Sequence, residues 1–389
     1  MSNTETSPGG VSHRRHETPF YHALRGRVTE LGGMLNAHVH LDRYGTLDDR
    51  YFEHTARDVL ESSHVSLHEK HDLIGSVHLG QAYQREDIQR RANECLDTMV
   101  ACNTFRTDTM VDVTDDNVGL SALEALAEVK AQRKQEIDVQ IGAYSPFGFT
   151  AREPKRWEVF EAGVAKADFI GCLPEADDTD NYPDHIGFME HCRRVLELAQ
   201  RENKLVHVHT DQRHESSEEG TERLIEAIQK YGAPRSRDGE PLVWAVHMLS
   251  PTTYPEERFQ RLARSLTECN VGVICCPSAA LGMRQLRPLM TPTYNSIPRL
   301  LELLSAGVHV RIGSDNIADM CSPSTTADLT DEVFVLSAAL RFYNVDVLAR
   351  IAAGQRLSAA EVDYVRGHLE DNERQIQKVL RETGHEPAG

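Results

Sequence analysis

Short apolar runs rich in β-branched residues alternate with longer amphipathic segments along most of the chain. The runs have the length of buried β-strands, and the segments between them repeat apolar positions at helical spacing. Several of these segments end in Gly or Asn, as helix C-termini do. Eight strands are predicted in this way, over residues 33–40, 107–113, 138–144, 168–174, 204–210, 242–248, 271–277 and 308–315.

A strand followed by a helix, repeated eight times, is the pattern of a closed parallel (β/α)8 barrel, the TIM barrel of the α/β class. A doubly wound open sheet is the competing architecture on this pattern alone. We expect the barrel over residues 31–350, after a flexible N-terminal arm (1–30) and before a helical tail (351–389) packed on the barrel. The long segment 44–105 follows the first strand, and loops in that position commonly cover an active site.

Composition narrows the class of protein. The net charge is -18 and acids and bases are interleaved, so no basic face for nucleic acid is indicated. The chain shows neither an apolar run of membrane-spanning length nor the apolar core of a signal peptide at its N-terminus. The eight cysteines form no CxxC pair, which argues against a zinc ribbon or a disulfide framework. We therefore expect a cytoplasmic protein with no membrane partner.

Histidines and one aspartate end four of the predicted strands. His38 and His40 end the first, His209 the fifth, His247 the sixth and Asp315 the eighth. The C-terminal ends of barrel strands meet at one mouth, where barrel enzymes build their sites. Such residues are poor choices for a barrel interior unless they are paired or ligated. Imidazole and carboxylate together bind divalent metals, so the joint pattern predicts a metal site.

Each of these residues also has an ordinary explanation when taken alone. An HxH pattern on a strand is commonly a pair of polar positions, and Asp315 before Asn316 could be a helix cap or a turn residue. His207 points to the same face as His209, because residues two apart on a strand do so. It is either a buried packing histidine behind the ligands or itself the ligand of this strand, and we expect the first.

The motifs HVHLDR, VHTDQ, VHMLS and GSDN, in this order and on these strands, resemble the amidohydrolase superfamily over residues 33–345. The branch they resemble is the cytosine deaminase-like group, which includes N-isopropylammelide isopropylaminohydrolase. The resemblance implies one divalent metal ion per subunit, which is zinc, iron or manganese. It also implies assembly into a homo-oligomer.

Carried over by position, the resemblance implies that His38, His40, His209 and Asp315 are metal ligands. It implies that Asp315 also touches the nucleophilic water and that His247 polarises the attacked group and moves protons. The residue types fit, because a metal held by neutral imidazoles lowers the pKa of bound water toward neutrality. Asp315 can then accept the proton of that water, and His247 can stabilise charge on the substrate.

One departure from the family pattern concerns proton transfer. Deaminases of this branch carry a glutamate after the aspartate of the fifth strand, and here that place is taken by Gln212, a third catalytic candidate. An amide cannot shuttle a proton near neutral pH. A stable anion such as nitrite or chloride leaves without a proton, whereas an amine needs one. Alternatively, Asp211, His214 or His247 does the shuttling.

Two further departures concern the substrate and the domain structure. Cytosine deaminases hold the pyrimidine with a glutamine just after the third strand, where this chain has Pro146 or Phe147. Tyr144, Phe147 and Met110 suggest a more apolar substrate slot, with Asn316 as a further substrate-binding candidate. These could also be ordinary wall residues. The small β-sandwich of many relatives is expected to be absent, because few residues precede the first strand and the tail is helical.

The expected function is hydrolytic displacement of a substituent from a carbon of a small nitrogen heterocycle by metal-activated hydroxide. The leaving group is an amine or ammonia, or an anion such as nitrite or chloride. Denitration by a 2-nitroimidazole nitrohydrolase kind of enzyme would suit Gln212 and the apolar slot. Opening of a cyclic amide or lactam is one alternative, and a non-catalytic ligand-binding barrel is another.

Overall fold

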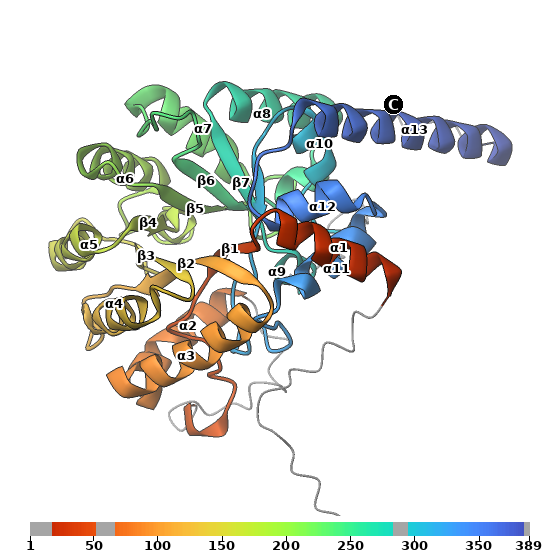
Figure 1. Ribbon diagram of the computed structural model, residues 1–389. Coiled ribbons are helices and arrows are strands. Elements are labelled where there is room, and N and C mark those ends of the chain that lie inside the picture. The colour runs from red at the N-terminus through yellow and green to blue at the C-terminus, as the bar shows by residue number, and fades with distance from the viewer. Residues whose placement is uncertain (1–17, 52–66, 283–294, 385–389) are drawn as a thin grey trace, which may run out of the picture.

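A single sheet of eight parallel strands forms the centre of the protein (Figure 1). The computed structural model describes residues 18–51, 67–282 and 295–384. Neighbours in the sheet follow chain order from first to last, and β1 and β8 are brought together by a parallel bridge between Val39 and Asp315. The predicted (β/α)8 barrel and its eight strands are therefore confirmed. The strands are β1 (Met34–Val39), β2 (Thr104–Asp112), β3 (Asp138–Tyr144), β4 (Phe169–Cys172), β5 (Val206–Thr210), β6 (Val243–His247), β7 (Val271–Cys275) and β8 (Val310–Ile312).

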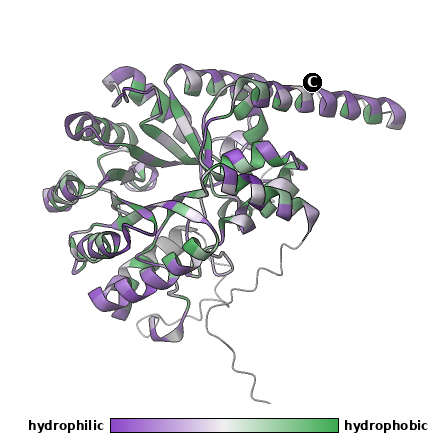
Figure 2. Cartoon of the chain, viewed as in Figure 1, coloured by the Kyte–Doolittle hydropathy of each residue, from purple (hydrophilic) through white to green (hydrophobic). Residues whose placement is uncertain are grey.

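Helices surround this sheet and cover its outer face. Figure 2 shows mainly hydrophobic strands and helices whose outer faces are hydrophilic. Strands with both faces covered read as continuous apolar runs, as β6 and β7 do. The helices are α1 (Pro19–Glu30), α2 (Leu67–His78), α3 (Arg85–Ala101), α4 (Ser121–Arg133), α5 (Pro154–Lys166), α6 (Phe188–Glu202), α7 (Gly220–Tyr231), α8 (Glu256–Glu268), α9 (Pro277–Gly282), α10 (Leu300–Ser305), α11 (Leu329–Leu340), α12 (Val345–Ala352) and α13 (Ala359–Thr383).

Glycines on the strands make room for large side chains of their neighbours. A Cβ at Gly272 on β7 would overlap the ring of Trp244, which is fully buried on β6. The same relation holds between Gly142 on β3 and Phe169 on β4. In both places a large side chain on one strand packs over a glycine on the neighbouring strand, which keeps the interior closely packed.

Replacing Gly272 by alanine is expected to destabilise the protein by about 1–3 kcal/mol, because the added methyl overpacks a filled core. The matched control is Gly26→Ala in α1, where a Cβ meets no atom within 4 Å. That change is expected to stabilise by about 0.5–1 kcal/mol, since glycine is unfavourable inside a helix. Urea unfolding measures both variants, and equal effects would contradict this account of the core.

The chain termini differ from the predicted arm and tail. Residues 19–30 form α1, which begins at the Thr18 cap and Pro19 and packs against α12 through its buried residues Tyr21, Leu24 and Val28. Residues 1–17 of the predicted arm lie outside the described residues. The tail is helical as predicted, but α13 contacts α10, buries only Val365 and then extends away from the barrel (Figure 1). The prediction that the tail packs on the barrel therefore holds only for the N-terminal part of α13.

The predicted long loop contains two helices. α3 packs against α4 as part of the helical ring, and the end of α2 contacts Asp112 at the C-terminal end of β2. There the ring of His78, the last residue of α2, lies 5.5 Å from the ring of Phe147 after β3. Residues 52–66 of this segment lie outside the described residues. In the described part of the chain, the strands all belong to the barrel sheet, and no helix has the length and hydropathy needed to cross a membrane.

Candidate metal centre and active site

Four histidines and Asp315 converge inside the mouth of the barrel. His38, His209 and His247 form one group whose potential ligand atoms lie within 4.8 Å of one another, and His38, His40 and Asp315 form a second such group. The ring centroids of His38 and His209 are 5.0 Å apart, as are those of His209 and His247. All five side chains are buried. The convergence predicted from the strand ends is thus present, with His38 common to both groups.

Asp315 closes the barrel at this point. Its backbone N–H donates to the carbonyl oxygen of His38 at 2.8 Å, and its Oδ1 lies 3.5 Å from His38 Nε2 and 3.4 Å from His40 Nε2. Both Asp315 and His247 have positive φ, +61° and +78°. Residues other than glycine rarely adopt this conformation, and it occurs preferentially where a site fixes a side chain.

The charge states at neutral pH suit a metal. Burial lowers the pKa of His247 to about 4 and that of His40 to about 3, and it holds the pKa of His209 well below its ordinary value. Burial alone would raise the pKa of Asp315, but the imidazoles of His38 and His40 beside its carboxyl group outweigh this effect and hold that pKa well below its usual range. Neutral imidazoles beside an ionised carboxylate are the forms that ligate divalent metals.

Two of the histidines, His38 and His209, have ring nitrogens that are available to bind a metal. Both ring nitrogens of His38 are buried and have no hydrogen-bond partner, which is costly unless the imidazole has a ligand. His209 Nδ1 lies 3.2 Å from the carbonyl oxygen of Cys172, so Nδ1–H donates and Nε2 keeps its lone pair. A backbone carbonyl on the second nitrogen is the usual support of a ligating histidine.

His40 has a contact that sequence reasoning missed. Arg43 Nη2 lies 2.5 Å from His40 Nδ1, and a guanidinium can only donate. Nδ1 of His40 therefore accepts, and the neutral ring carries its proton on Nε2, toward Asp315. This arrangement suits the protein without metal, and a metal on His40 Nε2 requires that proton to leave. Arg43 was visible in the motif HVHLDR, but no pattern indicated that it turns back onto the histidine.

His207 lies apart from both ligand groups. Its side chain is fully buried with both ring nitrogens unpartnered, 4.6 Å from the ring of Phe169 and 6.1 Å from that of His38. Among the described residues it belongs to neither group of possible metal ligands. This is the place expected for a packing histidine behind the ligands.

The four predicted substrate-binding residues are not all at the centre. The ring of Tyr144 lies 5.7 Å from that of His40, and Asn316 Nδ2 donates to Asp315 Oδ1 at 3.2 Å. Phe147 packs against His78 instead. Met110 is completely buried in a cluster with Tyr144, which favours its alternative role as an ordinary wall residue.

Gln212 contacts an acid that the sequence did not single out. Its Nε2 donates to Glu175 Oε2 at 3.3 Å, and Glu175 Oε1 accepts from the backbone N–H of Asp211. Glu175 lies in the short 3-10 helix Pro174–Asp177 directly after β4. The sequence signal was weak, since one acid after a strand is common in a loop.

The other proton-transfer candidates have structural partners. The carboxylate of Asp211 accepts from the backbone N–H groups of Gly220 and Thr221 at 2.7 and 2.9 Å, at the N-terminus of α7. His214 Nε2 lies 2.9 Å from Thr252 Oγ1. Both side chains therefore stabilise the loop after β5. Of the three predicted alternatives to Gln212 for proton transfer, His247 lies in the cluster of possible metal ligands. The structure adds Glu175 as a further candidate for this role.

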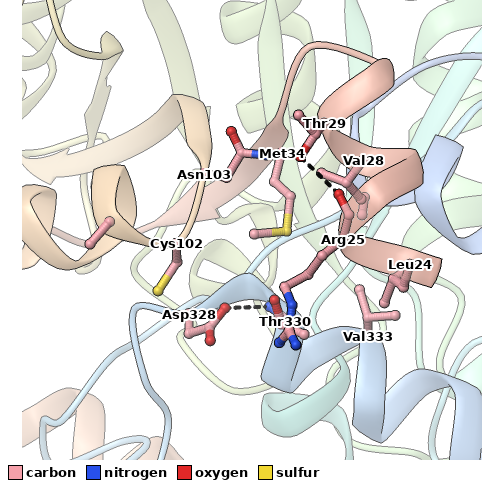
Figure 3. A pocket seen from close by; sticks show the side chains of 12 residues that line it. Leu24, Arg25, Val28, Thr29, Met34, Cys102, Asn103, Asp328, Thr330 and Val333 are labelled. Carbon is pink, nitrogen blue, oxygen red and sulfur yellow. Dashed lines mark hydrogen bonds between the residues drawn. The ribbon is translucent and has the colours of Figure 1, made fainter. Parts of the chain in front are cut away.

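A separate cavity of about 350 Å³ lies between α1, the end of α3 and α11 (Figure 3). It touches Met34 at the start of β1, whereas His38 and His40 lie at the other end of that strand. It is thus distinct from the candidate centre. Its lining is mostly apolar and comprises Leu24, Arg25, Val28, Thr29, Met34, Ala101, Cys102, Asn103, Asp328, Thr330, Val333 and Ala352.

Comparison with known sequences gives little guidance on activity. No protein-family model matches the chain. A protein of Haemophilus influenzae described as uncharacterized is 24% identical over 291 residues, which cover 75% of this chain and 97% of that protein. This relative has no described activity to compare.

Solved structures are more informative about the fold. 5-Methylcytosine deaminase from Klebsiella pneumoniae, with phosphonocytosine bound, matches with a TM-score of 0.69 and 23% identity, covering 82% of this chain and 73% of that one. N-isopropylammelide isopropylaminohydrolase from Burkholderia multivorans matches with a TM-score of 0.61 and 16% identity, over 86% and 82% of the two chains. This chain therefore has the same fold as these two enzymes. Guanine deaminase from C. acetobutylicum shares it at a TM-score of 0.52 and 11% identity, over 83% and 72%.

Proposed function

We propose that the protein is a metal-dependent hydrolase that displaces a substituent from a carbon of a small nitrogen heterocycle. The observation that carries this proposal is the buried cluster of His38, His40, His209, His247 and Asp315, drawn from four strand ends. The solved structures support the class of reaction, because two are named deaminases and one an aminohydrolase.

His38, His40, His209 and Asp315 would hold one zinc, iron or manganese ion. Such an ion, when bound, makes water acidic enough to lose a proton near neutral pH. The ionised Asp315 accepts that proton. His247, whose pKa of about 4 keeps it neutral, donates a hydrogen bond to the substrate atom that gains charge.

The leaving group decides what else the site needs. The oxygen of water bonds to the ring carbon, the bond to the substituent breaks, and its electron pair departs with the substituent. A nitrite or chloride ion then needs no proton, which suits Gln212, whereas an amine or ammonia takes one proton. Hydrolytic deamination is the outcome that the solved structures favour. Opening of a cyclic amide differs, because both fragments stay in one product.

A heterocycle panel tests the proposal. Metal-loaded protein is incubated with cytosine, guanine, N-isopropylammelide, 2-nitroimidazole and a chlorotriazine, and released ammonia, amine, nitrite and chloride are measured. We expect turnover of at least one compound and a fall of at least about 100-fold in kcat for Asp315→Asn, because proton transfer of this kind contributes about 10²–10⁴. The exposed Asp184→Asn is the control.

Other outcomes of the same panel would contradict the proposal. A single product heavier by one water indicates ring opening. Tight binding with unchanged recovery of the compound, by protein that holds its metal, indicates a binding barrel.

A further inference from the structure

Glu175 is fixed at the ends of two neighbouring strands, β4 and β5. One carboxyl oxygen accepts from the backbone N–H of Asp211, and the other accepts from the side-chain amide of Gln212 at 3.3 Å. Gln212 follows the candidate ligand His209 by three residues. The carboxyl group of Glu175 is therefore hydrogen-bonded to Gln212. Gln212 is the residue that stands where the deaminases that the sequence resembles have a glutamate.

The surroundings of Glu175 are acidic. A Cβ placed on Gly220 would lie 2.7 Å from Glu175 Oε1 and 3.0 Å from Asp211 Oδ1, so these two oxygens flank the same spot. Glu218 is a third acid of this region, and its partner Arg213 is half-exposed. Carboxyl groups that lie close together in a buried region raise one another's pKa, which favours the form in which one of them keeps a proton.

The hydrogen bonds indicate which group keeps it. Asp211 accepts from two backbone N–H groups and from the hydroxyl of Thr221. Glu218 accepts from the backbone and side chain of Arg213 and from the hydroxyl of Ser250. Burial, and then the charges of Glu218 and Asp211, raise the pKa of Glu175 well above its ordinary value.

We propose that Glu175 supplies the proton that an amine leaving group requires, at the place where Gln212 offers no acid. This inference rests on the proposed function and narrows its substrate class to amino- or alkylamino-substituted heterocycles. As the C–N bond breaks, its electron pair stays on nitrogen, and the carboxyl group of Glu175 gives that nitrogen its proton. The carboxylate is then reprotonated, through solvent, by the proton that the attacking water lost to Asp315. Water and the substituted ring thus become a hydroxylated ring and a free amine.

The kinetic test compares Glu175→Gln with wild type on two substituents of one ring. For an amino substituent, kcat is expected to fall at least about 100-fold, since a positioned general acid contributes about that much. For a nitro or chloro substituent on the same ring, kcat is expected to stay unchanged. Gln212→Glu in the Glu175→Gln background is expected to restore activity on the amino compound. Glu219→Gln, an exposed acid nearby, is the control, and metal content and unfolding temperature are checked for each variant.

A second measurement needs no substrate. At pH 7 the infrared difference between wild type and Glu175→Gln is expected to contain the carbonyl band of a protonated carboxylic acid, which the Glu219→Gln difference lacks. The inference is overturned if that band is missing, or if kcat falls equally for both substituents. It is also overturned if Glu175→Gln keeps full activity on an amino compound that wild type hydrolyses. If metal-loaded wild type hydrolyses nothing, the proposed function itself fails.

Discussion

Purified protein is expected to contain about one zinc, iron or manganese ion per chain, and His38→Ala is expected to contain almost none. His38 belongs to both groups of possible ligands, and its two ring nitrogens are buried without any other partner. Loss of even a supporting residue weakens metal binding by about 10–100-fold, so loss of a shared ligand is expected to weaken it by more than about 100-fold. Elemental analysis of dialysed protein measures the effect.

His207→Leu is the matched control for this experiment. His207 is equally buried and also has two unpartnered ring nitrogens, but it belongs to neither ligand group. The variant is expected to keep its metal. Loss of metal from both variants would mean that disruption of the barrel interior, and not ligation, explains the result. Wild type without metal, even after supplementation with all three ions, would show that the histidines serve another purpose.

Asp112→Ala is expected to destabilise the protein by about 3–5 kcal/mol, the range for removing one partner of a buried ion pair. Asp112 is completely buried at the end of β2, where its Oδ2 accepts from Tyr83 at 2.6 Å and from His78 Nε2 at 3.1 Å. The backbone N–H of Asp112 donates to Asp42 at 2.9 Å. The variant leaves His78 without this carboxylate and loosens α2 from the barrel. Urea unfolding measures the loss.

The control for Asp112 is Asp371→Ala on the exposed helix α13. Asp371 pairs with Arg374, and exposed pairs contribute only about 0–1 kcal/mol. The two variants should therefore differ by several-fold in their effect on the free energy of unfolding. A cost for Asp112→Ala no greater than for Asp371→Ala would contradict the importance of the buried network.

The same ion pair predicts how stability changes with pH. Burial lowers the pKa of His78, but hydrogen bonds with Asp112 and Asp116 outweigh it and raise the pKa to about 9, above the ordinary 6.5 of an unfolded histidine. A group whose pKa is raised by folding binds more protons in the native state. Its contribution is therefore complete below about pH 6.5 and is lost as the pH rises through about 9. The urea midpoint of wild type should fall across this window, and that of His78→Asn should fall less.

Some elements were predictable because their signal is local. The segment 138–144 was predicted as a strand and is β3 with the same bounds, since a short apolar run before a polar turn is decided by neighbouring residues. The helix α1 was missed although Thr18, Pro19 and the buried positions 21, 24 and 28 form a cap and an apolar stripe. That stripe is stable only because α12 covers it, and α12 lies more than three hundred residues away.

By itself the sequence determined the barrel and the gathering of His38, His40, His209, His247 and Asp315, because the ends of consecutive parallel strands must meet at one mouth. Only the tertiary structure decided which side chains surround them. Glu175 accepts a hydrogen bond from Gln212, which is 37 residues away in the chain, and Asp112 accepts one from His78 at the end of α2. Such contacts depend on how irregular loops pack over the strand ends. The spacing of apolar residues along the sequence contains no information about that packing. The position of Glu175 beside Gln212 could therefore be found only from the tertiary structure.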